Sequence, residues 1–182
     1  MEKTKPQSTD ATPFAVRRDE FSKSKLAMSL DYVFGKNTCK ALNYSDLTFQ
    51  YSRRTGRLKY VLENESVLFS LRPNGSIAPS RLGFSKLLSK TKLAKLHNRP
   101  RWSVTVMDGV SPIVSQGNTV FCKHVVHCSD LLRAGEDVVI LNEKGEVLAV
   151  GRSTLAGPTI KQFKRGAAVK VREGIQSAPD EF

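Results

Sequence analysis

Four side chains that can ligate zinc lie close together in the second half of the chain: Cys122, His124, His127 and Cys128. Thiolate sulfur and imidazole nitrogen are the usual ligands of tetrahedral zinc. On a strand, however, positions 122, 124 and 128 share one face while position 127 takes the other, so four ligands cannot converge without a break in the strand. We therefore expect no metal and no other cofactor, and interpret the cysteines as structural thiols.

The sequence carries no other signature of catalysis, since it has no GxGxxG, P-loop, nucleophile elbow or paired-carboxylate pattern. Its three cysteines are odd in number and lack framework spacing, which predicts reduced thiols. No run of about 18 apolar residues is present for a membrane span, and the start MEKTKPQSTD has no apolar signal segment. A non-catalytic, cytoplasmic protein with no membrane partner is expected.

Positive charge is the strongest compositional feature of the chain, which carries a net +12. Residues 26–110 hold fourteen Lys or Arg against five Asp or Glu, whereas residues 111–175 hold nine against six. A basic surface suits a phosphate polymer, because each neutralised phosphate releases condensed counterions. The alternative is a solvated basic surface that serves only solubility. We favour a polyanionic partner.

A β-hairpin over residues 47–62 is predicted by alternating apolar side chains on either side of SRRTGR. Its tip carries Arg53, Arg54 and Arg57 together with Gly56, which tolerates the positive φ of such loops. Three guanidinium groups on one protruding tip suit contact with phosphates. The alternative is that a hairpin tip must be polar in any case.

The rest of the first half predicts one more strand and two helices. A polar arm over residues 1–25 precedes a short helix in KLAMSLDYVFGKN, and a strand over 67–71 ends at Arg72 before the turn RPNG. Ser80 is the expected cap of a helix that places Lys86 and Lys90 on one face and extends less regularly to His97. Pro100 breaks this helix and marks the expected domain boundary.

From Trp102 onward the pattern is one of short strands and tight turns. WSVTVM, NTVFCKHVV, DVVILN, EVLAVG and AAVKVRE predict strands, while SPIVSQG and PTIKQFKRG predict single helical turns. Several short strands at this spacing favour a small closed barrel. The overall expectation is an α+β protein, in which a small antiparallel sheet-plus-helix domain precedes a β pseudo-barrel.

The segments LRAGEDVVILNEKGEVLAVGRSTLAG and FKRGAAVKVREG resemble a PUA domain. The resemblance rests on Gly135, Leu148 to Gly151, Gly157, Phe163, Gly166 and the alternation of Val169 and Val171. It implies a PUA pseudo-barrel over residues 101–175 with a tail over 176–182. In PUA domains the segment between helix and strand and the final strand commonly form the RNA surface.

The upstream segments DYVFG, LTFQYSRRTGRLKYV and LFSLRPNGSI resemble the patch-forming domain that precedes PUA in archaeal archaeosine tRNA-guanine transglycosylases. This implies a pre-PUA α+β domain over residues 26–100 and tRNA as the ligand. The enzyme also needs a TIM barrel of a few hundred residues, which cannot fit before Leu26. Catalysis by this chain alone is therefore not expected.

We expect RNA contacts from cations of both domains and from a glycine loop that lets the backbone approach a phosphate. Phe121 is expected in the core rather than against a base, because it alternates with Val125. The expected contact residues are Arg53, Arg54, Arg57, Arg72, Lys86, Lys90, Gly117, Asn118, Lys123, Lys161, Lys164 and Arg165.

Three functions are compatible with this sequence. The first is a tRNA-binding module, which can be the RNA-binding subunit of a split archaeosine transglycosylase. The second is a protein-docking subunit for a separate tRNA-modifying catalytic chain. The third is a translation factor that associates with ribosomes and initiator tRNA. Salt-sensitive binding of free tRNA favours the first, obligatory co-purification with an enzyme the second, and co-sedimentation with small ribosomal subunits the third.

Overall fold

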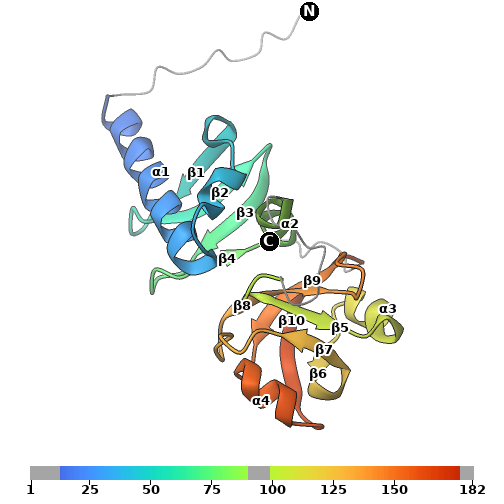
Figure 1. Cartoon of the computed structure of the whole chain (residues 1–182). Coiled ribbons are helices and arrows are strands. Elements are labelled where there is room, and N and C mark those ends of the chain that lie inside the picture. The colour runs from blue at the N-terminus through green and yellow to red at the C-terminus, as the bar shows by residue number, and fades with distance from the viewer. Residues whose placement is uncertain (1–12, 90–98, 177–182) are drawn as a thin grey trace, which may run out of the picture.

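The computed structural model describes residues 13–89 and 99–176, which form two packed domains (Figure 1). The first combines helices with a four-stranded antiparallel sheet, and the second curls a six-stranded mixed sheet into a barrel. This confirms the predicted α+β class and its order, with a sheet-plus-helix domain followed by a pseudo-barrel.

The first domain begins with a long helix that lies along the sheet (Figure 1). Its elements are α1 (Pro13–Phe34), two 3-10 turns (Thr38–Ala41 and Tyr44–Asp46), β1 (Leu47–Tyr51), β2 (Leu58–Glu63), β3 (Ser66–Leu71), β4 (Ile77–Pro79) and α2 (Arg81–Ser89). The strands follow chain order. The predicted hairpin is confirmed, with Phe49 opposite Val61, and so is the cap, since Ser80 Oγ accepts a hydrogen bond from Gly83 N at 3.1 Å.

The expected polar arm was wrong from Pro13 onward, because residues 13–25 belong to α1. The fold supplies partners that the local pattern does not reveal. The Arg18 guanidinium stacks on the Tyr51 ring at 3.6 Å, and the Tyr51 hydroxyl donates to Asp19 at 2.8 Å. Strand β4 was also missed, since three residues after a turn carry too short an alternation.

The second domain contains six strands in the order β6-β10-β9-β8-β5-β7. Its elements are β5 (Ser103–Val106), α3 (Ser111–Ser115), β6 (Val120–Phe121), β7 (Val125–Cys128), β8 (Asp137–Leu141), β9 (Val147–Ser153), α4 (Gly157–Gln162) and β10 (Ala167–Gly174). Strand β5 pairs parallel with β8, and the other pairings are antiparallel. The single strand expected in NTVFCKHVV is interrupted by a 3-10 turn over Cys122–His124.

One of the two hydrophobic clusters in the described residues spans both domains, and the other lies within the barrel. Leu26, Leu30 and Phe34, one face of α1, belong to the same buried cluster as Val139 and Leu141 of the barrel strand β8. Between them the ring of Trp102 stacks on Phe84 at 5.4 Å and meets Phe34 edge-on at 5.6 Å. The two domains therefore pack through shared apolar surface rather than a hinge.

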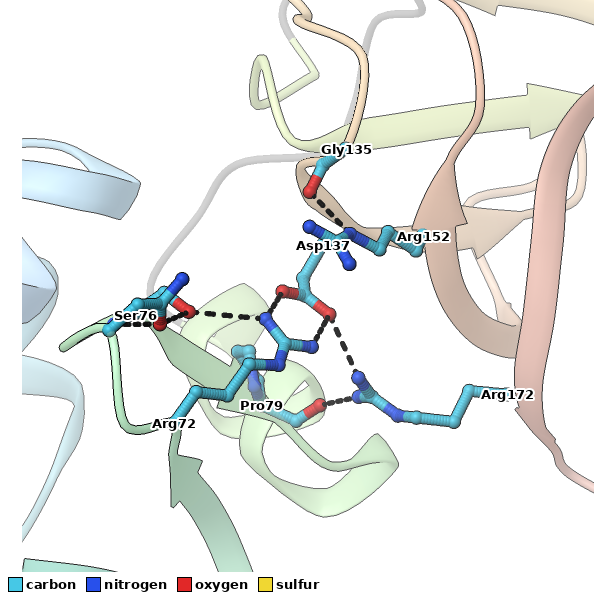
Figure 2. A network of polar contacts seen from close by, with 8 residues as sticks. Arg72, Ser76, Pro79, Gly135, Asp137, Arg152 and Arg172 are labelled. Atoms are coloured by element: carbon cyan, nitrogen blue, oxygen red, sulfur yellow. Dashed lines mark hydrogen bonds and ion pairs between the residues drawn. The ribbon is translucent and has the colours of Figure 1, made fainter.

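A polar network lies beside this core and joins the domains a second time (Figure 2). The Asp137 carboxylate accepts two hydrogen bonds from the Arg72 guanidinium, at 2.7 and 2.9 Å. It also accepts one from Arg172 at 2.8 Å, and Arg172 donates further to the Pro79 carbonyl of β4. One nearly buried carboxylate thus connects the turn after β3 to strand β10.

Candidate nucleic-acid interface

A hollow of about 420 Å³ lies on the barrel between α3 and β6. Apolar and polar side chains share its wall, among them Ile113, Asn118, Thr119, Val120, Phe121 and His124. Figure 1 shows that both elements lie at the same side of the barrel. An apolar wall with a few hydrogen-bonding groups is the usual composition of a site for a flat organic ligand.

The position of Phe121 differs from the sequence-based expectation. Its side chain is 47% exposed, so it is not a core residue. The 3-10 turn that starts at Cys122 ends the strand here, and it is Cys122 that becomes buried. Ile113 of α3 is 54% exposed in the same hollow. Two large apolar side chains are thereby presented to solvent, as in surfaces that bind unstacked bases.

The predicted glycine loop has a more specific geometry than expected. Gly117 ends α3 with φ near +96°, and its N–H donates to the Val114 carbonyl at 2.9 Å, which leaves that N–H unavailable to a phosphate. Asn118 lines the hollow, and its Nδ2 donates to the Ile113 carbonyl at 3.1 Å. Lys123 is exposed on the 3-10 turn directly after Phe121.

The predicted cations near the final strand fall into two groups. Lys164 and Arg165 are exposed in the loop between α4 and β10. Lys161 is also exposed, but its Nζ lies 2.7 Å from Asp130. The hydrogen bond to this carboxylate raises the pKa of Lys161. Lys164 and Arg165 are therefore the better candidates for contact with phosphate.

The tip of the β1–β2 hairpin presents Arg53, Arg54 and Arg57, all exposed. Gly56 adopts φ near +64°, as the prediction of a tight loop requires. The tip is also fixed to α1, because the Arg18 guanidinium donates to the Gly56 carbonyl. Three exposed side chains thus project from a backbone that is held in place.

Two of the cations that we expected to contact RNA form ion pairs with carboxylates of this chain, and their contact with RNA stays a prediction. Arg72 is held by Asp137 in the interdomain network, and this hydrogen bonding raises the pKa of Arg72. Lys86 donates to Glu63 at 2.6 Å. The sequence pattern could not reveal these partners, which lie 65 and 23 positions away. Lys90 lies outside the described residues.

The four cysteine and histidine side chains do not form a metal site in the part of the chain that the structure describes. Cys122 and Cys128 are buried among apolar side chains of the barrel core, and burial raises the pKa of both thiols. Within residues 13–89 and 99–176, no cluster of three or more metal-ligating side chains is present. The helices of the same residues are too short or too polar to cross a membrane.

Sequence reasoning missed several residues of these surfaces. Ile113, Thr119 and His124 line the barrel hollow but lie in three different elements or loops, so no local pattern connects them. Lys59 follows the hairpin tip in β2 and was not among the expected contact residues. The one available signal in the sequence was that Lys59 lies two residues after Arg57, on the strand that leaves the basic tip.

Comparison with known proteins accounts for both domains. The PUA domain family matches residues 102–175, and the patch-forming domain C2 of tRNA-guanine transglycosylase matches residues 24–83. The chain therefore has the two-domain architecture of a C2-type patch-forming domain followed by a PUA domain.

Sequence relatives show which proteins contain the same pair of domains. The tRNA-guanine(15) transglycosylase of Methanocaldococcus jannaschii is 33% identical over 154 residues, which are 84% of this chain and 23% of that enzyme. The same enzyme of Methanosphaera stadtmanae is 32% identical over 90% of this chain and 25% of its own length. The chain thus corresponds to one region, about a quarter, of the archaeosine-type transglycosylases.

A solved structure of similar size has the same fold. A hypothetical protein of Pyrococcus horikoshii OT3 superposes with a TM-score of 0.66 and 25% identity, covering 88% of this chain and 92% of that one. A PUA-domain structure from Aeropyrum pernix K1 gives a TM-score of 0.61 at 14% identity, which shows the fold alone. The two-domain arrangement therefore occurs in proteins of about this length.

Proposed function

We propose that this protein is a non-catalytic RNA-binding module whose ligand is tRNA and whose setting is tRNA modification in the cytoplasm. The observation that supports it most is the barrel hollow, where exposed Phe121 and Ile113 lie beside Asn118, with Lys123 two residues after Phe121. A base can stack on the ring while the amide bonds its edge and the ammonium pairs with the phosphate.

The relatives support the choice of tRNA, because the enzymes that share this region are named for exchange of guanine 15 in tRNA. The chain spans only about a quarter of these enzymes, so their transglycosylation is not assigned to it. We infer for this chain only the role of a region outside the catalytic barrel, which is to hold the RNA.

The test is equilibrium binding of a tRNA transcript to the wild-type chain and to Phe121→Ala. Stacking on an aromatic side chain contributes about 1–3 kcal/mol per base, so we expect affinity to fall at least about fivefold. Leu131→Ala removes an apolar side chain elsewhere in the second domain that is even more exposed, at 70% against 47%, and should leave binding unchanged. If the wild-type chain bound tRNA no better than a neutral polymer at low salt, the proposed function would be wrong.

A second candidate, a docking subunit for a separate transglycosylase chain, is favoured by the outer face of α1. Phe21, Met28 and Tyr32 are 70%, 68% and 90% exposed, and their spacing places them within about 40° of one another around the helix. Such an apolar stripe is typical of surfaces that contact another protein.

Met28→Glu combined with Tyr32→Glu tests this candidate. The double variant should lose co-elution with a transglycosylase catalytic chain while it keeps its affinity for tRNA. Unchanged co-elution would exclude the α1 stripe as the docking surface.

A further inference from the structure

A second hollow, of about 290 Å³, lies on the first domain between the β1–β2 tip and the turn that follows β3. Among the described residues, every charged side chain that lines it is cationic: Arg54, Arg57, Lys59 and Arg72. Asp137 neutralises Arg72, so the charges of Arg54, Arg57 and Lys59 remain available to a ligand, although Lys59 Nζ also lies over the Tyr60 ring at 4.7 Å. A concave surface with cations of one sign concentrates the positive potential and favours an anion.

The composition of the wall of this hollow further limits the class of ligand that it can bind. Half-buried Leu58 and Leu71 and exposed Pro73 form an apolar part beside the cations. A free inorganic anion makes no contact with the apolar part of the wall, whereas a nucleotide presents a phosphate and an adjoining flat nucleoside that can contact both parts. The combination of guanidinium groups and apolar contact matches a nucleotide unit of single-stranded RNA.

Both rims of this hollow are held in place before any ligand arrives. On one rim, Gly56 N donates to the Ser52 carbonyl and Ser52 N to the Arg57 carbonyl, each at 2.8 Å. On the other, Arg72 N donates to the Ser76 carbonyl at 2.9 Å, and the Arg72 guanidinium is fixed by Asp137 (Figure 2). A fixed backbone loses little conformational entropy on binding.

We propose that this hollow binds one internal phosphate of an RNA backbone through Arg54, Arg57 and Lys59, with the adjoining nucleoside against Leu58, Leu71 and Pro73. The proposal rests on RNA binding as the function and adds a second, independent contact on the C2-type domain. The proposal also predicts different roles for the tip arginines. Arg53 is charged and exposed like Arg54 and Arg57, but it does not line the hollow.

The experiment compares Arg54→Ala/Arg57→Ala with Arg53→Ala in the full chain, using tRNA at several salt concentrations. The double variant should bind about tenfold more weakly near 0.1 M salt, and its slope of log K against log salt should be smaller by about 1, as expected for one lost phosphate contact. Arg53→Ala, the matched control, should change affinity less than about twofold. An equal loss in Arg53→Ala would show a diffuse basic tip and overturn the proposal.

Two further measurements separate this site from its alternatives. Inorganic phosphate should shift the NMR amide signals of residues 52–59 and 71–75 in the wild-type chain but not in the double variant; no shift would contradict the site. Short single-stranded RNA with a 5′-phosphate should bind as tightly as the same RNA with a 5′-hydroxyl. Much tighter binding of the 5′-phosphorylated RNA would show that the site binds a terminal phosphate, and would overturn the proposal of an internal phosphate.

The result for Phe121→Ala keeps the two proposals distinct. If that variant lost tRNA binding while Arg54→Ala/Arg57→Ala bound as wild type, RNA binding would stand and this hollow would be excluded. If the wild-type chain bound no tRNA, the proposed function would be wrong. The RNA-phosphate site would then be overturned as well, whatever the phosphate titration showed.

Discussion

Trp102 lies where α1, α2 and the barrel meet, and both its ring and its N–H have partners. Its side chain is 4% exposed, and its Nε1 donates to the Phe34 carbonyl at the end of α1 at 2.9 Å. The stacked and edge-on contacts with Phe84 and Phe34 each contribute about 0.5–1.5 kcal/mol beyond area burial. This residue therefore connects three elements through packing and one hydrogen bond.

Trp102→Phe should lower the free energy of unfolding by about 2 kcal/mol, because it leaves the buried Phe34 carbonyl without its donor and removes one ring. Trp102→Ala should cost about 3–5 kcal/mol. Urea unfolding followed by circular dichroism measures both. A loss below about 0.5 kcal/mol in Trp102→Ala would contradict the junction described for this side chain.

At the scale of elements, the end of α1 is defined by Asp31. Its carboxylate accepts hydrogen bonds from Cys39 N at 2.8 Å and Asn37 N at 3.2 Å, which fixes the 3-10 turn Thr38–Ala41 beneath the helix. The backbone hydrogen bond from Cys39 is the main reason why the pKa of Asp31 lies below its ordinary value. The ionised form is thus the one that the fold favours.

Because the pKa of Asp31 is lower in the folded chain than in the unfolded chain, its contribution is complete well above the ordinary pKa of 3.8 and is lost as pH falls through the folded pKa. Asp31→Asn should destabilise the protein by about 1 kcal/mol at pH 7. The difference from wild type should shrink below pH 4. Thermal unfolding at both pH values checks this, and a difference that grew on acidification would contradict it.

Elements with strong local signals could be predicted from the sequence, and those defined by distant partners could not. The alternation around SRRTGR and the Ser80 cap each act within a few residues, so β1, β2 and the start of α2 were predicted correctly. The first turns of α1 depend on contacts with Tyr51, about thirty positions away. Phe121 was misplaced because the 3-10 turn after it breaks the alternation that a strand would continue.

Sites were predicted less well than elements for the same reason. The exposure of the three tip arginines could be predicted because they are close in sequence, while their contact with RNA stays a prediction. The free or paired state of a cation, by contrast, depends on carboxylates elsewhere, as Lys86 with Glu63 shows. Both hollows combine residues from separate elements, which only the fold brings together.

At the scale of the whole molecule, Asp137 is the main polar connection between the domains. Its carboxylate is 6% exposed and faces two guanidinium groups that are 30% and 39% exposed. Removing the carboxylate leaves Arg72 and Arg172 facing each other without a counter-charge. Partly exposed pairs of this kind are stronger than surface ion pairs and weaker than fully buried ones.

Asp137→Ala should lower the free energy of unfolding by about 2–3 kcal/mol, measured by urea titration with Trp102 fluorescence. Asp130→Ala is the matched control, since it breaks the exposed pair with Lys161 and should cost less than about 0.5 kcal/mol. Equal losses in the two variants would show that the interdomain network has no special contribution.

The shared core determines where the polypeptide can be divided. A cut between residues 89 and 99 would leave Trp102, Val139 and Leu141 uncovered on one fragment and Phe34 and Phe84 on the other. Each fragment would expose a contiguous apolar surface and would tend to aggregate. Recombination that separates the two domains would therefore be selected against, so the pair is expected to be inherited as one cassette, whatever protein it is joined to.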